Sequence, residues 1–209
     1  MDSTTEDTST AKKSTLKKNL IEWGVILGVI GILYATGLHT NVISTMQRGL
    51  LATGLIKPSI PELAEYNTFP VASNEFYFAD EQGVVRSLEQ FQGKTIFMNV
   101  WASWCAPCIA EMPSIQRLYD QFKDRDDLVF LMVSMDEDPE RARSFMQQRD
   151  YSMPVYYFRH RDSAAYNSGM IPTTYVISPG GRLLLEKRGL AKYDTPDFIA
   201  FLDEVSSGS

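Results

Sequence analysis

The feature that most constrains the fold is an apolar stretch followed at once by a cysteine pair and an amphipathic pattern. Residues 95–102 read TIFMNVWA, and such a near-continuous apolar run is typical of a strand covered on both faces. The only two cysteines, Cys105 and Cys108, follow within one helical turn of each other. Apolar residues then recur at i, i+3, i+4 and i+7 over residues 115–122, which predicts one face of a helix. We therefore expect the cysteines where a buried strand ends and a helix begins.

The second half of the chain alternates strand-like and helix-like patterns. Asp138 before Pro139 and Thr195 before Pro196 are residue pairs that commonly begin helices. Apolar runs bounded by turn residues predict further strands, two of them joined by a hairpin. The predicted strands lie at 76–79, around 84, and at 128–135, 153–158, 173–178 and 182–188. This order predicts an α/β fold with a central mixed sheet flanked by helices.

The N-terminal part has a different character. Residues 1–19 are rich in Ser, Thr, Asp and Lys, which predicts a disordered cytoplasmic tail. Residues 20–38 carry one charge, Glu22, and as a helix they would extend roughly 28 Å, enough to span a membrane. Lysines precede this segment and should stay in the cytoplasm. We predict a single-pass anchor in the inner membrane, with a domain of residues 73–209 on the periplasmic side.

Two alternatives remain open in this region. A cleavable signal peptide also fits, because residues 35–37 are small and suit a cleavage site. Residues 39–72 are predicted to form an amphipathic segment and a proline-rich linker. The apolar stripe of this segment fits the membrane surface and the surface of the domain equally well. Whether residues 20–38 are an anchor or a cleaved signal peptide, we expect the domain to be exported.

Composition and residue counts exclude several classes of function. The formal charge of −6 argues against nucleic acid as a partner, because phosphate binding needs clustered basic residues. A Cys-x-x-Cys disulfide closes too small a loop to stabilise the fold, so we expect a bond between these cysteines to serve chemistry. A structural zinc site needs four ligands, and His39 and His160 are the only histidines. We predict no metal and no cofactor other than a redox-active disulfide.

Thiol–disulfide exchange requires one exposed thiolate and a second thiol that resolves the mixed disulfide. On the first turn of a helix, Cys105 would be the nucleophile and Cys108 the resolving thiol. Lowering a thiol pKa from about 8.5 to about 7 takes roughly 2 kcal/mol, whereas a helix terminus supplies about 0.3–1 kcal/mol when exposed and up to about 2 kcal/mol when partly buried, so the helix end alone is marginal. A hydrogen bond from Cys108 is therefore expected to complete the shift.

The sequence around the cysteines resembles a known family. Residues 104–108, WCAPC, are similar to the active site of thioredoxin, and the continuation EMP at 111–113 resembles the membrane-tethered TlpA/ResA-like thiol–disulfide oxidoreductases. The resemblance covers roughly residues 73–205. It implies a thioredoxin-like fold and redox activity outside the cytoplasm.

The resemblance also implies roles for residues beyond the cysteines. Ile171 and Pro172 match the family's cis-proline loop, which lies against the cysteines and offers backbone groups to an extended substrate. Trp104 is expected to border and shield the active site, and Pro107 lies between the cysteines. These four residues are the predicted substrate-binding residues.

A further implied role concerns Glu111. Asn99 occupies the position of a buried aspartate in thioredoxin, so that acid is missing here. In ResA-like proteins a glutamate at the position of Glu111 is associated with tuning the cysteines. A desolvated Glu111 would have a raised pKa and could relay a proton to or from Cys108. The alternative is an ordinary solvated glutamate on an amphipathic helix.

The residues between the cysteines indicate the direction of electron flow. Ala106 and Pro107 add no His or Lys that would stabilise a thiolate, so a reductant is favoured over a strong oxidant. We expect the protein to keep the thiols of chosen exported proteins reduced, for example those of apocytochrome c, and to be rereduced by a membrane thiol relay. A disulfide oxidase or isomerase is one alternative. A Sco-like copper-handling protein that uses both thiolates and His160 is another.

Overall fold

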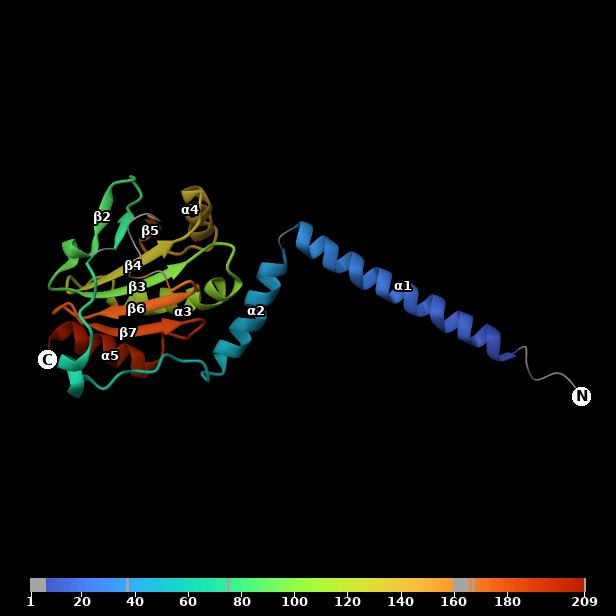
Figure 1. Cartoon of the computed structure of the whole chain (residues 1–209), viewed down its shortest axis with the longest axis horizontal. Coiled ribbons are helices and arrows are strands. Elements are labelled where there is room, and N and C mark those ends of the chain that lie inside the picture. The colour runs from blue at the N-terminus through green and yellow to red at the C-terminus, as the bar shows by residue number, and fades with distance from the viewer. Residues whose placement is uncertain (1–6, 37, 75, 160–165, 167, 209) are drawn as a thin grey trace, which may run out of the picture. The chain divides into compact units, whose positions relative to one another are not determined.

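A mixed sheet organises the C-terminal part of the chain (Figure 1). The computed structural model describes residues 7–36, 38–74, 76–159, 166 and 168–208. Within these residues the sheet has seven strands in the order β2-β1-β5-β4-β3-β6-β7. The strands are β1 (Tyr77–Ala79), β2 (Val85–Ser87), β3 (Thr95–Trp101), β4 (Leu128–Ser134), β5 (Val155–Phe158), β6 (Thr173–Ile177) and β7 (Leu183–Arg188).

The strand pairing around β3 decides which strand ends lie side by side at one edge of the sheet. β3 runs parallel to β4 and antiparallel to β6, with Val100 opposite Thr173. The carboxyl end of β3 therefore lies beside the beginning of β6. β4 pairs with β5 in parallel, while β1 with β2, β1 with β5, and β6 with β7 are antiparallel. The predicted mixed sheet is confirmed.

The helices begin where the sequence indicated. Asp138 caps the N-terminus of α4 by accepting a hydrogen bond from the backbone N–H of Glu140 at 3.0 Å. Thr195 caps α5 by accepting from the N–H of Phe198 at 3.4 Å. The helical elements are α1 (Asp7–Ala35), α2 (Leu38–Ala52), η1 (Leu63–Thr68), η2 (Leu88–Phe91), α3 (Ala106–Phe122), α4 (Pro139–Gln147) and α5 (Pro196–Ser207).

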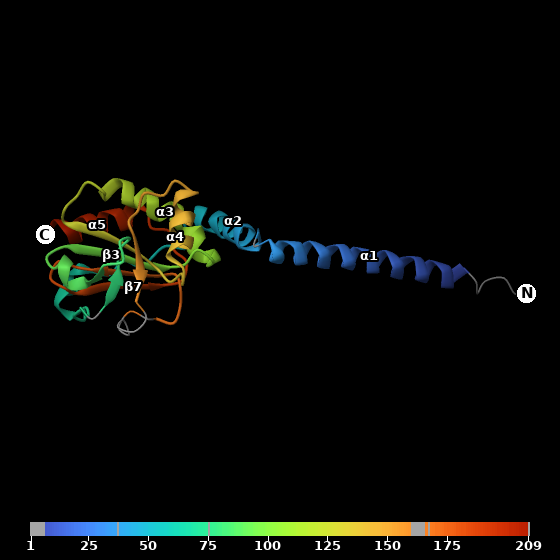
Figure 2. The same ribbon diagram turned by 90° about the horizontal axis from the view of Figure 1, so that it is seen from above.

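The two faces of the sheet carry two separate cores. Phe97 and Trp101 of β3 pack with buried side chains of α3, α4 and α5, and Figure 2 shows α3 and α5 along one side of the sheet. Met98 and Val100 point to the other face and pack with Phe76 and other residues of the second core. All of β3 is buried, as a strand covered on both faces requires.

Residues 1–42 form a compact unit separate from residues 43–209. Helix α1 begins at Asp7, so its first turns lie in the segment predicted to be disordered; residues 1–6 of that tail fall outside the described residues. Alanine, leucine and lysine in these turns favour a helix once its backbone hydrogen bonds are formed. In the described part of the chain, the segments Ile21–Ala35 and Leu38–Ala52 have the length and hydropathy of a membrane span only as a pair bent by 96°, and no single helix does.

The segment predicted as a linker contacts the domain. The N–H of Ala72 donates to the carbonyl of Gly181 at 2.8 Å, and the N–H of Leu183 donates to the carbonyl of Pro70 at 2.9 Å. Because these residues pair with the beginning of β7, the chain is already part of the folded domain before the predicted start at residue 73.

Candidate active site

The two cysteines form a disulfide where β3 ends and α3 begins. Cys105 is the N-cap residue of α3, and its Sγ accepts a hydrogen bond from the backbone N–H of Cys108 at 3.3 Å. Pro107 lies in the first turn, where its missing N–H costs no intrahelical bond. The predicted strand-to-helix position of the pair is confirmed.

The two sulfurs differ in access to solvent. Cys105 retains 6% of its surface and Cys108 none, while Trp104 just before them is 56% exposed. An incoming thiol can therefore approach Cys105 but not Cys108. This asymmetry fits an attacking and a resolving thiol.

The loop before β6 lies at the same edge of the sheet as the cysteines. The Ile171–Pro172 peptide bond is cis, and Pro172 is buried. Its carbonyl accepts a hydrogen bond from the N–H of Gly189 at 2.8 Å. Because Thr173 pairs with Val100 near the end of β3, this loop lies next to the segment that leads to Cys105.

Glu111 is buried in α3 with no exposed surface. One carboxylate oxygen accepts from Nδ2 of Asn99 at 2.8 Å and the other from the N–H of Ala191 at 3.1 Å. Burial raises the pKa of Glu111 from 4.5 to about 8, against the opposing effect of these hydrogen bonds and of Lys187. The alternative of a solvated glutamate is therefore wrong.

A polar network extends from Glu111 to β6. Asn99 Nδ2 also donates to Oγ1 of Thr174 at 2.9 Å, and the hydroxyl of Tyr193 donates to the same oxygen at 2.7 Å. Asn99 Oδ1 is buried without a hydrogen-bond partner among the described residues. The network joins the helix of the cysteines to the strand that follows Pro172. Among the hydrogen bonds of the described residues, none joins Glu111 to a cysteine sulfur.

A second polar cluster holds the loop between β3 and Cys105. The buried carboxylate of Asp136, just after β4, accepts from the N–H of Ser103 at 2.9 Å and from its hydroxyl at 2.7 Å. The hydroxyl of Ser134 donates to the same carboxylate at 2.8 Å. This cluster fixes the backbone immediately before Trp104 and Cys105.

No metal site adjoins the cysteines in the described part of the chain, where no three His, Cys, Asp or Glu side chains gather closely enough to hold an ion. His160, the histidine considered as a copper ligand, lies outside the described residues.

Comparison with known proteins identifies the family. The sequence model named Redoxin matches residues 64–183, more than half of the chain. The chain belongs to the Redoxin family. The Redoxin match begins within η1 and ends at the start of β7, so it includes both cysteines and the cis-proline loop.

Curated relatives of this Redoxin protein confirm the resemblance to ResA-like proteins. It is 35% identical over 97 residues to the thiol–disulfide oxidoreductase ResA of Oceanobacillus iheyensis, covering 46% of this chain and 50% of that protein. It is 30% identical over 115 residues to ResA of Bacillus thuringiensis subsp. konkukian, covering 54% and 66%. The match thus spans half to about two thirds of these relatives.

A solved structure shows the same fold. The thioredoxin-family thiol:disulfide interchange protein of Chlorobium tepidum superposes on 66% of the Redoxin protein and 97% of its own chain, with a TM-score of 0.54 and 22% identity. The expected thioredoxin-like fold is confirmed.

Sequence analysis missed part of the site of this Redoxin protein. Thr174, Tyr193 and Ala191 hold the polar network but are distant from Glu111 along the chain, and no local pattern links them. Asp136 could have been predicted as a site residue from the sequence, because it follows shortly after a buried strand and such residues lie at the sheet edge where the cysteines are expected.

Proposed function

We propose that this protein is a thiol–disulfide oxidoreductase that reduces disulfides in exported proteins through Cys105 and Cys108. The observation that carries the proposal is the disulfide itself, which lies at the start of α3 with one sulfur partly exposed and the other buried. The neighbouring cis-Pro172 loop and the names of the ResA relatives support the same activity.

The reaction begins with the reduced protein. The Cys105 thiolate attacks one sulfur of the substrate disulfide, forms a mixed disulfide and releases the other substrate sulfur as a thiolate. Cys108 then loses its proton and attacks Cys105 Sγ, which forms the Cys105–Cys108 bond and releases the second substrate thiol. Two electrons pass to the substrate, and the two sulfurs are the only redox group required. A membrane protein with a reduced dithiol would then restore the Cys105–Cys108 dithiol by the same exchange.

We assign Glu111 as the group that exchanges a proton with Cys108. Glu111 follows Cys108 by one helical turn, and groups at i and i+3 are neighbours on a helix. Its raised pKa of about 8 suits proton transfer near neutral pH. Trp104, Pro107, Ile171 and Pro172 form the surface on which the substrate binds in this proposal.

The location and targets belong to the same proposal. An apolar segment at 20–38, preceded by lysines, supports a single-pass anchor in the inner membrane with the redox domain outside the cytoplasm. The lack of His or Lys between the cysteines supports a reductant, and apocytochrome c cysteines are the targets that we propose.

Trapping substrates in the native host tests the activity. Cys108→Ser removes the resolving thiol, so mixed disulfides should accumulate on Cys105 and can be identified by mass spectrometry after thiol alkylation. The matched controls are Cys105→Ser and the double variant, which should trap nothing. If Cys108→Ser also traps no exported protein, the proposed turnover is wrong.

The reduction potential tests the direction. A value near that of thioredoxin, about −270 mV, supports a reductant. A value near that of DsbA, about −120 mV, would instead make the protein an oxidant.

A further inference from the structure

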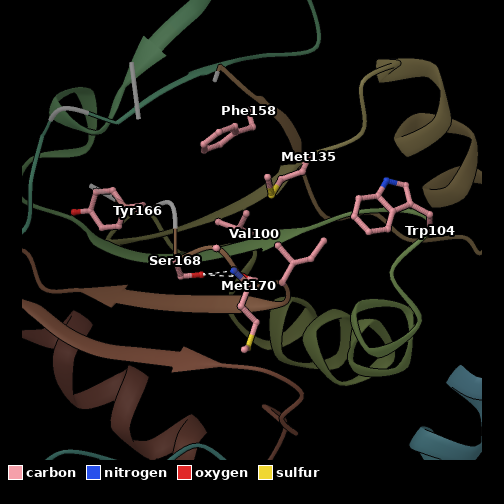
Figure 3. A pocket seen from close by; sticks show the side chains of 9 residues that line it. Val100, Trp104, Met135, Phe158, Tyr166, Ser168 and Met170 are labelled. Carbon is pink, nitrogen blue, oxygen red and sulfur yellow. Dashed lines mark hydrogen bonds between the residues drawn. The ribbon is translucent and has the colours of Figure 1, made fainter. Parts of the chain in front are cut away.

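A cavity of about 190 Å³ opens beside the redox site (Figure 3). Its walls come from β3, the loop before Cys105, Met135 directly after β4, β5, and residues 166 and 168–171. Figure 3 shows Trp104 and Tyr166 at opposite sides of the cavity, with Val100 and Met135 between them. Several distant segments thus form one concave surface.

The cavity adjoins both segments that a substrate must touch. Trp104 immediately precedes the nucleophile Cys105, and Ile171 immediately precedes Pro172. A polypeptide bonded to Cys105 and lying along the cis-proline loop would therefore pass the mouth of the cavity. Met170 and Trp104, which are 54% and 56% exposed, present large apolar side chains there.

The lining is mostly apolar, with Ser168 and Tyr166 as its hydroxyl-bearing residues, and it is adaptable. Val100, Phe158 and Met135 face the cavity, and its described lining residues include no charged side chain. Methionine side chains adjust to irregular shapes and pack well against aromatic rings. Since small-molecule sites usually have volumes of about 300–1,000 Å³, this smaller cavity suits a single side chain.

Hydrogen bonds hold the wall formed by residues 166 and 168–171. The hydroxyl of Tyr166 donates to the carbonyl of Ser73 at 2.9 Å. Oγ of Ser168 donates to the carbonyl of Met170 at 2.8 Å, and Oγ1 of Thr173 donates to the same carbonyl at 2.7 Å. The cavity wall is therefore tied to the strand that follows Pro172.

We propose that this cavity binds a large apolar side chain of the substrate protein, adjacent to the substrate cysteine that bonds to Cys105. The inference rests on the proposed function and deepens it by naming the substrate class, which is disulfides flanked by an aliphatic or aromatic residue. The apolar cavity would bind such a side chain without leaving a polar group unpaired, whereas an acidic side chain would lose its hydration there.

Synthetic peptides test this selectivity with the full-length protein. Each peptide carries one cysteine as a mixed disulfide with glutathione and has Phe, Leu, Gly or Asp beside that cysteine, on either side. The pre-reduced protein reacts in a single turnover, in which its dithiol becomes a disulfide and releases peptide thiol and glutathione. We expect the second-order rate constant for the Phe or Leu peptide to exceed that for the Gly or Asp peptide by about 10-fold or more.

Two pairs of variants locate the selectivity. Phe158→Ala removes a cavity wall, and Phe91→Ala is its matched control, because both rings are partly buried against the same core but only Phe158 lines the cavity. Met170→Lys adds a charge at the exposed mouth, and Val84→Lys adds one to a residue of similar exposure, 52%, in the β1–β2 connection. The cavity variants should lower the Phe-to-Gly rate ratio by about 10-fold, and the controls should keep it.

The outcomes separate this inference from the proposed function. If the wild type reduces all peptides at one rate, the cavity is not a specificity site although the redox activity stands. The same conclusion follows if Phe158→Ala and Met170→Lys keep the wild-type ratio. If the wild type reduces no peptide, the proposed function itself is wrong. Since Met170 is exposed, its variant gives an answer even if Phe158→Ala unfolds.

Discussion

At the scale of single residues, the surroundings of Glu111 strongly change the pKa of its carboxyl group. It is fully buried, and its pKa rises from 4.5 to about 8 mainly because burial disfavours the charged form. Between these two pH values the folded state holds a proton that the unfolded state has released. The stability contributed by this group is therefore complete below pH 4.5 and declines as the pH rises to about 8.

This linkage gives a prediction for Glu111→Gln. In the oxidised protein the wild type should lose about 5 kcal/mol of unfolding free energy between pH 4.5 and pH 8 through this residue, at 1.36 kcal/mol per pH unit. The amide does not ionise, so the variant should lack this part of the slope. Urea unfolding at several pH values measures the difference.

Glu140→Gln is the matched control, because Glu140 is a largely exposed glutamate in the first turn of α4. Its pH profile should follow the wild type. A Glu111→Gln profile parallel to the wild type would mean that the carboxyl group of Glu111 ionises as freely in the folded protein as in the unfolded chain.

At the scale of elements, the site depends on how the connection from β3 to α3 is held. Asp136, just after β4, receives hydrogen bonds from Ser103 and Ser134, so the connections that follow two parallel neighbouring strands together fix the segment that carries Trp104 and Cys105. Buried donors that lose their acceptor are costly.

Asp136→Ala should therefore destabilise the protein by about 2–3 kcal/mol, since it leaves donors of Ser103 and Ser134 unpaired. Asp138→Ala is the matched control, because Asp138 caps α4 at an exposed position, where the loss should be about 1 kcal/mol. Chemical denaturation of both variants measures these losses. Equal losses would show that the Asp136 cluster contributes no more than an ordinary helix cap.

The elements around the cysteines could be predicted from the sequence because their patterns are local. The apolar run of β3, the helical spacing in α3 and the caps of α4 and α5 each lie within a few neighbouring residues. The contacts of Glu111 and the walls of the cavity could not be predicted, because they form only after the strands have paired: Asn99 then reaches Thr174 in one place, and Phe158 and Tyr166 line the cavity in another. The resemblance to a family supplied the cis state of Pro172, which spacing alone does not indicate.

At the scale of the whole molecule, the chain divides into residues 1–42 and the redox unit of residues 43–209. The apolar side chains of Ile21, Ile26 and Ile30 in α1 are exposed within the first unit. Exposed apolar surface of this kind needs a partner, and the proposed function assigns it to the lipid bilayer.

Cell fractionation tests this assignment. The full chain should stay in the membrane fraction after a high-salt wash and require detergent for extraction, whereas residues 43–209 alone should be soluble. Ile30→Lys places a charge within the apolar segment, at a cost of about 2.5–3.5 kcal/mol for insertion, and should weaken retention. A mature protein that begins after residue 37 would mean a cleaved signal peptide instead of an anchor.

The unequal access to the two sulfurs has a consequence for turnover. In the proposed cycle, the electron donor and the client protein must both react at Cys105 because Cys108 is enclosed, so they cannot occupy the protein together. Each cycle must release one partner before the other arrives, which is ping-pong kinetics. An excess of either partner in the wrong redox state would therefore act as a competitor at the same sulfur.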